Sequence, residues 1–375
     1  MDLGLSEAQE MLQRGARDVL AHECSAAVVR AAEERATGID GALWKTMAEL
    51  GWLGMTIPER YGGLGATILD QALLAEELGR ALVPGPYAET CVILPQLLLA
   101  AGSEQQRQLI LPSVVAGRLL AVLALLEAED EQRTRATQSA TSAGDEEGIW
   151  RVKPFVAYAP AADVVITPIR PHPFGEIDRV LLFERAAPGL AIEPSPSLTG
   201  CALGEVRFEG ARPSASHVLG AGQEVLPVLR RALAVGATIA AAYQVGMAAA
   251  VLEMTVEYAK NRIAFGQPIG AFQAIQYKLV GMLNDLDGAR LATREAAWRF
   301  DEGMADAEFA SSVAKYLASE GLRSSCFEAH EVHAGVGFML DYDLQLYYRR
   351  AKWWEQFLGH PSEHRDRIAA ALLDR

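Results

Sequence analysis

The stretch Asn261-Arg-Ile-Ala-Phe-Gly-Gln-Pro-Ile-Gly-Ala-Phe-Gln273 joins two long segments whose apolar residues recur at helical spacing. Gly266, Pro268 and Gly270 predict a tight turn of the backbone, so Arg262 is expected at a corner between two helices. A guanidinium carries planar donors that match the oxygens of a phosphate or pyrophosphate in pairs. An arginine at a helix corner also serves solubility or capping, and this stretch alone leaves both interpretations open.

The composition indicates a folded chain with a large apolar core. The 375 residues are 50% hydrophobic and 22% charged, and the formal net charge is −14. This acidity argues against nucleic acid or anionic membrane as the main partner, because both bind basic faces. The cysteines have no paired or metal-binding spacing and the first residues show no targeting segment, so we expect reduced thiols and a cytoplasmic location.

One segment is apolar enough to resemble a membrane span. Residues Val235 to Leu252 are rich in alanine and glycine and include Thr238, Tyr243 and Gln244. Small residues allow helices to approach closely, so the segment is predicted to be a buried helix of a bundle and no membrane span is expected.

The order of patterns predicts an α+β, mostly α fold in three parts: an N-terminal helical domain over residues 1–118, a small middle β-sheet domain over 119–217 and a C-terminal helical bundle over 218–375. Glu127 to Gly148 is predicted to be a long solvated loop. The glycine-rich Ile57–Gly65 is predicted to be a tight loop, either a connector or a lining of a substrate site. Helices are expected over Ser6–Cys24, Ile39–Leu50, Ile68–Leu82 and Ser103–Ala116, and strands at Trp150–Val156, Asp163–Thr167, Val180–Phe183 and Glu205–Phe208.

Several motifs lie in a recognisable order along the chain. They are Ile57-Pro-Glu-Arg-Tyr-Gly-Gly-Leu-Gly65, Tyr258-Ala-x-x-Arg262-x-x-Phe265-Gly266, Phe272-Gln273, Gly335-Val-Gly-Phe338 and Tyr347-Tyr-Arg-Arg-Ala-Lys352. Together with the order of helical, β and helical parts, they resemble the acyl-CoA dehydrogenase family. The resemblance implies that the C-terminal part is a four-helix bundle and that the protein is a tetrameric flavoprotein. It also implies FAD as cofactor, an acyl-CoA thioester as substrate and an electron-transferring flavoprotein as partner.

The resemblance also implies a catalytic glutamate, and this chain departs from it there. In such enzymes a glutamate removes the α-proton of the thioester while the β-hydrogen leaves as hydride to the flavin. The usual Glu-Gly-Thr falls on Leu358, Gly359 and His360, so the base is absent while the backbone N–H at 358 remains. The alternative position on the first bundle helix has no acidic residue between Arg231 and Leu252. Glu355 is the nearby carboxylate to test, although pairing with Arg350 or Lys352 would equally explain it, and His360 is expected to be a polar loop residue.

The motifs that face the flavin ring are also altered. The family's Thr-Glu-Pro-x-x-Gly-Ser loop falls on Leu125–Asp130, where Glu129 and Asp130 would add negative charge, and its Trp-Ile-Thr falls on Phe155–Ala157. The groups that such a chain donates to a neighbour's FAD are retained instead. These are Arg262, Phe265, Gln273, Gly335 and Gly337, although Glu331 and Ala334 replace the usual glutamine and glycine.

This uneven loss favours a subunit of a heteromeric acyl-CoA dehydrogenase, with a related partner chain that supplies the glutamate and binds most of the FAD. Three alternatives remain: an active homo-oligomer that uses Glu355 as a displaced base, a flavin monooxygenase on the same fold, and a scaffold that binds no cofactor. The sequence indicates no metal site and does not identify the acyl group.

Overall fold

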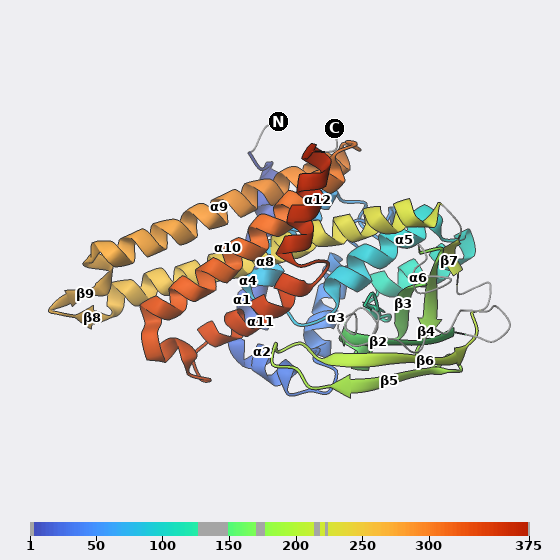
Figure 1. The fold of residues 1–375 in the computed structure, drawn as a ribbon, viewed down its shortest axis with the longest axis horizontal. Coiled ribbons are helices and arrows are strands. Elements are labelled where there is room, and N and C mark those ends of the chain that lie inside the picture. Colours follow the sequence, from blue (N-terminus) through green and yellow to red (C-terminus); the bar gives the residue numbers. More distant parts are fainter. Residues whose placement is uncertain (1–3, 127–148, 170–176, 214–217, 222–223, 374–375) are drawn as a thin grey trace. The chain divides into compact units, whose positions relative to one another are not determined.

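The computed structural model describes residues 4–126, 149–169, 177–213, 218–221 and 224–373. The chain forms two compact units, each assembled from separate segments. One unit combines Met1–Arg30, Ala66–Val83 and Ala234–Arg375, and the other combines Ala31–Gly65 with Pro84–Leu233. The architecture is α+β and mainly helical, as predicted (Figure 1). The predicted loop over Glu127 to Gly148 lies outside the described residues.

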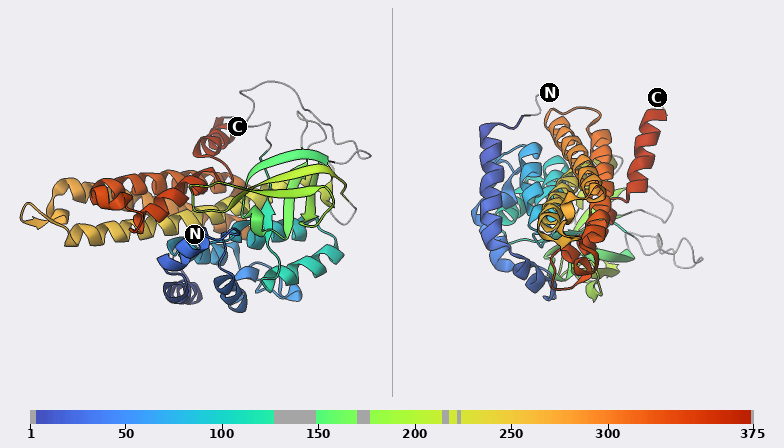
Figure 2. Two further views of the ribbon diagram at one scale, coloured as in Figure 1. Left: turned by 90° about the horizontal axis from the view of Figure 1, so that it is seen from below. Right: turned by 90° about the vertical axis from the view of Figure 1, so that its left-hand side faces the viewer.

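The first unit is helical. Helices α8, α9 and α10 run side by side in two views (Figure 2), and α11 and α12 follow them in the chain. The helices of this unit, including α2, which ends just beyond it, are α1 Glu7–Glu23, α2 Ala26–Glu33, α4 Ile68–Arg80, α8 Val225–Asn261, α9 Gln273–Asp301, α10 Ala307–His333, α11 Leu344–Gln356 and α12 Pro361–Leu373.

Small residues in α8 allow it to touch a neighbouring backbone. A Cβ added at Gly246 would lie 1.8 Å from the carbonyl oxygen of Glu76, and one added at Gly79 would lie 1.9 Å from that of Tyr243. Helices α4 and α8 therefore pack backbone against backbone. Among the described helices, α8 has the length and hydropathy of a membrane span, yet 94% of its apolar window is buried. It is the buried bundle helix that the sequence predicted.

The second unit begins with short helices. The predicted segments are present, and Asp40 and Ser103 cap α3 and α6 as expected, as Ser6 caps α1 in the first unit. After η2, Gly62 has φ +88°, which is the tight turn predicted within Ile57–Gly65. The elements are α3 Gly41–Glu49, η1 Trp52–Gly54, η2 Glu59–Tyr61, the π-helix η3 Glu89–Ile93, α5 Leu94–Ala101 and α6 Glu104–Val115.

The strands of the second unit form two sheets. One has the order β1-β3-β4-β7, with β1 parallel to β3 and the other pairs antiparallel, and the other sheet is the antiparallel set β2-β6-β5. Each of the predicted strands is found, and three further short strands complete the sheets. The bounds are β1 Ala121–Leu123, β2 Ile149–Ala157, β3 Val164–Ile169, β4 Arg179–Glu184, β5 Leu190–Ser195, β6 Leu203–Ala211 and β7 Val218–Ala221.

Candidate functional site

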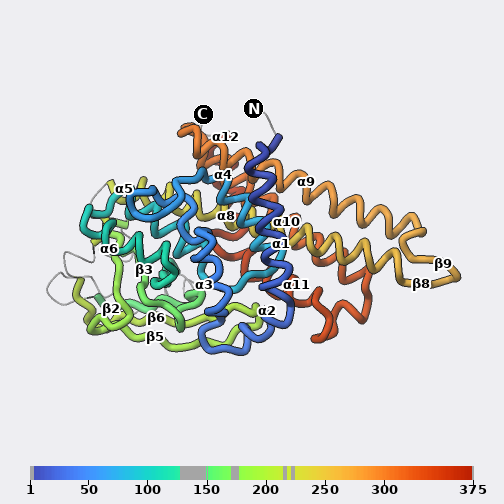
Figure 3. The backbone as a smooth tube through the Cα atoms, turned by 180° about the vertical axis from the view of Figure 1, so that it is seen from behind, coloured from blue at the N-terminus to red at the C-terminus, as the bar shows by residue number. Residues whose placement is uncertain are grey.

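Arg262 lies at the turn between α8 and α9, as the sequence predicted. The turn is a small hairpin of β8 Ile263–Ala264 and β9 Gln267–Pro268 at the end of these helices (Figure 3). The Arg262 N–H donates to the carbonyl of Tyr258 at 2.8 Å, and its carbonyl accepts from the N–H of Ile269 at 2.8 Å. The guanidinium is exposed and has no ion pair or hydrogen bond within the described part of the chain. Two hydrogen bonds therefore hold the backbone of Arg262, while its guanidinium is exposed to a ligand.

The neighbouring predicted residues are also exposed. Phe265 has a left-handed φ of +52° and is 96% exposed, with its ring edge-on to Phe272 at 6.1 Å. The side-chain amide of Gln273 donates to the hydroxyl of Tyr277 at 2.6 Å. The corner therefore presents Arg262, Phe265 and Gln273 together on the surface.

The end of α10 lies beside this corner. Tyr258 stacks on His333 with 4.3 Å between ring centroids, and Lys278 pairs with both Glu328 and Glu331. Glu331, which replaces the usual glutamine, therefore has its charge offset by Lys278. The structure thus brings together the two predicted parts, the Arg262 corner and the segment that follows His333.

That segment is the short helix η8, Ala334–Phe338, and its two glycines differ. A Cβ at Gly337 would meet His333, Leu344 and His330 at 3.2–3.4 Å, so internal packing explains this glycine. A Cβ at Gly335 would meet nothing within 4 Å, which leaves its backbone open to a ligand. Ala334 keeps a glycine-like backbone, with φ +53° and ψ −138°.

Leu358, which the sequence predicts at the position of the base, lies just after α11 and belongs to the same unit as the Arg262 corner. The carbonyl of Leu358 accepts from Nε2 of His364 at 3.1 Å. Glu355 is nearly buried, and its carboxylate lies 3.2 Å from Nζ of Lys352 and 3.6 Å from Nε2 of His360. The expected pair with Lys352 is confirmed, whereas Arg350 donates to the carbonyl of Leu82 at 2.5 Å.

His360 makes the contacts of a helix start. Its Nδ1 accepts from the N–H of Ser362 at 3.2 Å, and its own N–H donates to the carboxylate of Glu363 at 3.3 Å. These bonds cap the first turn of α12. They agree with the prediction of a polar loop residue.

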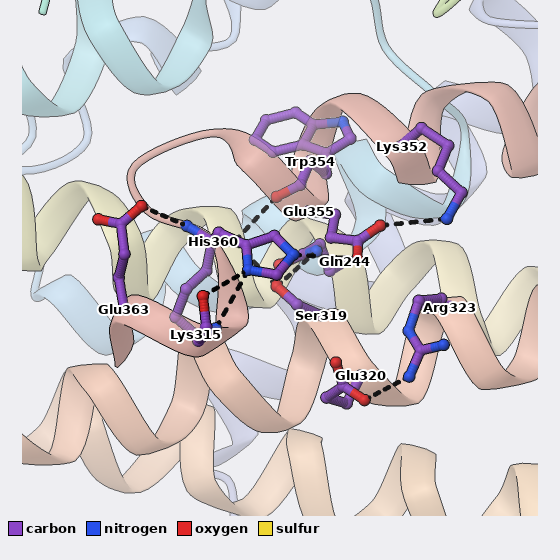
Figure 4. Close-up of polar contacts among 11 residues, drawn as sticks. Gln244, Lys315, Ser319, Glu320, Arg323, Lys352, Trp354, Glu355, His360 and Glu363 are labelled. Atoms are coloured by element: carbon purple, nitrogen blue, oxygen red, sulfur yellow. Dashed lines mark hydrogen bonds and ion pairs between the residues drawn. The ribbon is translucent and has the colours of Figure 1, made fainter. Parts of the chain in front are cut away.

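Two buried residues beside this loop were not predicted from the sequence. Lys315 is fully buried and donates from Nζ to the carbonyl of Trp354 at 2.8 Å and to the hydroxyl of Ser319 at 2.9 Å (Figure 4). Burial lowers its pKa to about 7, against the attraction of Glu355. Burial also lowers the pKa of His364 to about 3, and the charge of Lys315 adds to that effect. His364 is therefore a neutral donor to Leu358.

The described parts of the two segments that the sequence aligned with flavin-ring motifs belong to the second unit. Phe155 is part of a bulge in β2, with φ +54° and a partly exposed ring, while Val156 and Ala157 are buried. Leu125 and Leu126 follow β1, and the Glu127–Asp130 part of the other altered motif lies outside the described residues. The β2 position thus keeps an aromatic ring but has no hydroxyl or indole group.

Comparison with known proteins identifies the class to which this architecture belongs. Residues 6–118 match the acyl-CoA dehydrogenase N-terminal domain and residues 226–373 match the acyl-CoA dehydrogenase C-terminal domain. The chain is 34% identical over 340 residues to the probable acyl-CoA dehydrogenase YngJ of Bacillus subtilis, covering 88% of this chain and 89% of that protein. The chain belongs to the acyl-CoA dehydrogenase family, whose members are flavoprotein oxidoreductases.

Solved structures agree over the full length. The ChsE4-ChsE5 complex from Mycobacterium tuberculosis contains a chain with a TM-score of 0.89 and 27% identity, with complete coverage of both chains. A structure of PigA with FAD and proline has a TM-score of 0.87 and 26% identity, covering 99% of each chain.

Proposed function

We propose that this chain is one subunit of a heteromeric acyl-CoA dehydrogenase that performs FAD-dependent α,β-dehydrogenation of an acyl-CoA thioester. A related partner chain supplies the catalytic glutamate and most of the flavin-ring site. The observation that carries the proposal is the contrast between an exposed, unpaired Arg262 at the corner and Leu358 at the position of the base.

The residues around Arg262 fit the pyrophosphate end of FAD. The arginine has no internal acidic partner among the described residues, Gly335 is open, and Lys278 offsets the charge of Glu331. Arg262 would pair with phosphate oxygens, Phe265 and Gln273 would contact the cofactor from the corner, and Gly337 would keep η8 close to α10. When bound, FAD supplies the hydride acceptor of the reaction.

The residues around Leu358 fit thioester binding without proton removal. A leucine side chain cannot accept the α-proton, whereas its backbone N–H can donate to the thioester carbonyl. Glu355 is already paired with Lys352 and lies near His360, so it is a structural residue in this account. The glutamate that removes the proton therefore belongs to the partner.

The exposed apolar surface around the corner supports a partner of the same family. Tyr277, Val280 and Leu283 recur at three-residue spacing and so share one face of α9, and exposed apolar faces of this kind are typical of interaction sites. The similar ChsE4-ChsE5 structure is a complex of two proteins, which supports a heteromeric assembly here. We further propose an electron-transferring flavoprotein as electron acceptor and a cytoplasmic location. The exposed residues of the corner and of α9 are Ile263, Phe265, Tyr277, Val280 and Leu283.

The test is to co-express the chain with a related chain that carries Glu-Gly-Thr and to compare Arg262→Ala with Lys260→Ala in the complex. Both residues are exposed cations at the end of α8, and the account gives Lys260 no role. Because a hydrogen bond to a charged group contributes about 1.5–3 kcal/mol, Arg262→Ala is expected to weaken FAD binding roughly 10- to 100-fold. Equal FAD affinity in both variants contradicts the proposal.

A further inference from the structure

We propose that Lys315 is a positioning residue that frees the backbone N–H of Leu358 for the carbonyl oxygen of a bound thioester. Lys315 does so by donating to the carbonyl of Trp354, which is the acceptor that the Leu358 N–H would use if the helix continued. This inference rests on the proposed function. It gives Lys315 a part in preparing the thioester site, beside the glutamate and the FAD that take part in the reaction itself.

The regular hydrogen bonding of α11 ends just before Leu358. In an α-helix each N–H donates to the carbonyl four residues earlier, so the natural acceptor of Leu358 is Trp354. The preceding N–H, that of Phe357, still bonds to the carbonyl of Trp353 at 3.0 Å. Leu358 then adopts φ +59°, and its N–H has no acceptor among the residues that the structure describes. The helical hydrogen bonding of α11 thus stops at the N–H that the proposed function assigns to the thioester carbonyl.

The carbonyl of Trp354, which the Leu358 N–H does not use, has another donor. The carbonyl of Trp354 accepts from Nζ of Lys315, which is held in turn by the hydroxyl of Ser319. The side chain of Gln244 fixes that hydroxyl, since its amide nitrogen donates to Ser319 at 3.1 Å and its oxygen accepts at 3.2 Å. A buried chain of hydrogen bonds therefore connects α8, α10 and the last turn of α11 (Figure 4).

The carbonyl of Leu358 also has a buried side-chain partner. This carbonyl is fixed by the neutral ring of His364, and a Cβ on Gly359 would lie 2.8 Å from the same ring nitrogen. Buried side chains thus bond to the carbonyl of Leu358 and to the carbonyl of Trp354, four residues before it. A donor oriented before the ligand arrives stabilises charge on a carbonyl oxygen without reorganisation, which is how backbone N–H groups act in oxyanion sites.

Burial of a lysine ammonium is costly, and the surroundings explain how it is tolerated. Charged groups on two neighbouring helices act on it: the carboxylates of Glu355 on α11 and Glu363 on α12 raise its pKa, and burial lowers it. His364 on α12 remains neutral. A methionine would fill the same space without this cost, so the ammonium is explained by the hydrogen bond to Trp354 rather than by packing.

The test compares Lys315→Met, Lys315→Arg and the control Lys45→Met in the complex. Lys45 is an exposed lysine that forms only a surface pair with Glu49 at 3.6 Å. Hydrogen exchange of the Leu358 amide is measured in peptides covering 353–360. In the wild type and Lys45→Met it should exchange as an unbonded amide. In Lys315→Met the buried carbonyl recruits this N–H and exchange slows about tenfold, while Lys315→Arg keeps a donor and exchanges rapidly. Equal exchange in all variants overturns the proposal.

A second readout reports the ligand. Butyryl-CoA with a ¹³C-labelled carbonyl is bound to the complex, and the infrared carbonyl stretch is recorded. The wild type should shift the stretch to lower frequency, and Lys315→Met should lose that shift. If the wild type binds no thioester, the proposed function fails, while the exchange experiment still decides the role of Lys315. If Lys315→Met does not fold, Ser319→Ala replaces it, since it removes one support of the ammonium and should reduce the shift; an unchanged shift overturns the proposal.

Discussion

The ammonium nitrogen of Lys315 lies 2.8 Å from the carbonyl oxygen of Trp354, the acceptor that the N–H of Leu358 would use if α11 continued. The proposed function places Leu358 at the position of the family's base, and its carbonyl still bonds to the buried ring of His364. Burying the amine of Lys315 costs free energy, and here that amine donates to Ser319, whose hydroxyl is positioned by Gln244. This relationship favours a chain that still binds a thioester.

Gly359→Ala should destabilise the first unit by about 1–3 kcal/mol, because Gly359 has φ +115° and its added Cβ would press on His364. Gly281→Ala, on α9 with open space around it, is the matched control and should stabilise by about 0.5–1 kcal/mol. Urea unfolding of both variants measures the difference. Equal effects of the two substitutions would refute the role given to the Gly359 turn.

Because of His364, the free energy of unfolding should decrease as the pH falls. Its pKa is about 3 in the folded protein, against 6.5 for an ordinary histidine, so between these values the unfolded chain binds more protons. The free energy of unfolding should therefore decrease as pH falls from 6.5 to 3, beyond the decrease shown by His364→Gln, which keeps a donor for Leu358. Parallel pH profiles for the two proteins would show that His364 does not titrate in this way.

Ala334→Gly should stabilise the chain by roughly 1 kcal/mol, because Ala334 occupies a backbone conformation that glycine adopts without strain. The opposite sign is expected for Ala370→Gly on the exposed face of α12, where glycine costs about 1 kcal/mol. Thermal unfolding distinguishes them. Destabilisation by Ala334→Gly would mean that the alanine methyl group contributes more than its backbone costs.

Glu355→Gln should leave turnover of the complex within about twofold, a change in activation free energy of about 0.4 kcal/mol, because the account gives this carboxylate no part in proton removal. The measurement is acyl-CoA dehydrogenation by the complex, with Lys352→Met as the control that breaks the same pair from the other side. Loss of turnover in Glu355→Gln alone would support the displaced-base alternative.

Much of the fold follows from local patterns. The caps Ser6, Asp40 and Ser103 and the apolar periodicity predict α1, α3 and α6 to within a few residues. Three short strands, β1, β5 and β7, were not predicted. β1 and β7 are only three and four residues long, and a glutamate and a proline interrupt the apolar pattern of β5, so pairing within the sheets defines these strands.

The residues of the candidate site also differ in whether the sequence alone points to them. Arg262 and Leu358 are assigned from motif positions, because the chemistry belongs to the residue type, and their roles stay predictions. Lys315 and His364 resemble ordinary surface residues of α10 and α12 in the sequence, and only tertiary packing makes them buried partners of the Leu358 loop. Lysine and histidine at positions of an otherwise small and apolar helical face are the signal that could have revealed them.

The most direct test of the central claim is the flavin absorbance and acyl-CoA dehydrogenation of the purified chain, alone and with a related chain that carries Glu-Gly-Thr. The chain alone should hold little FAD and show no turnover, and the complex should be yellow and active, with FAD content that depends on Arg262. A lone chain with stoichiometric FAD and full turnover would contradict the account.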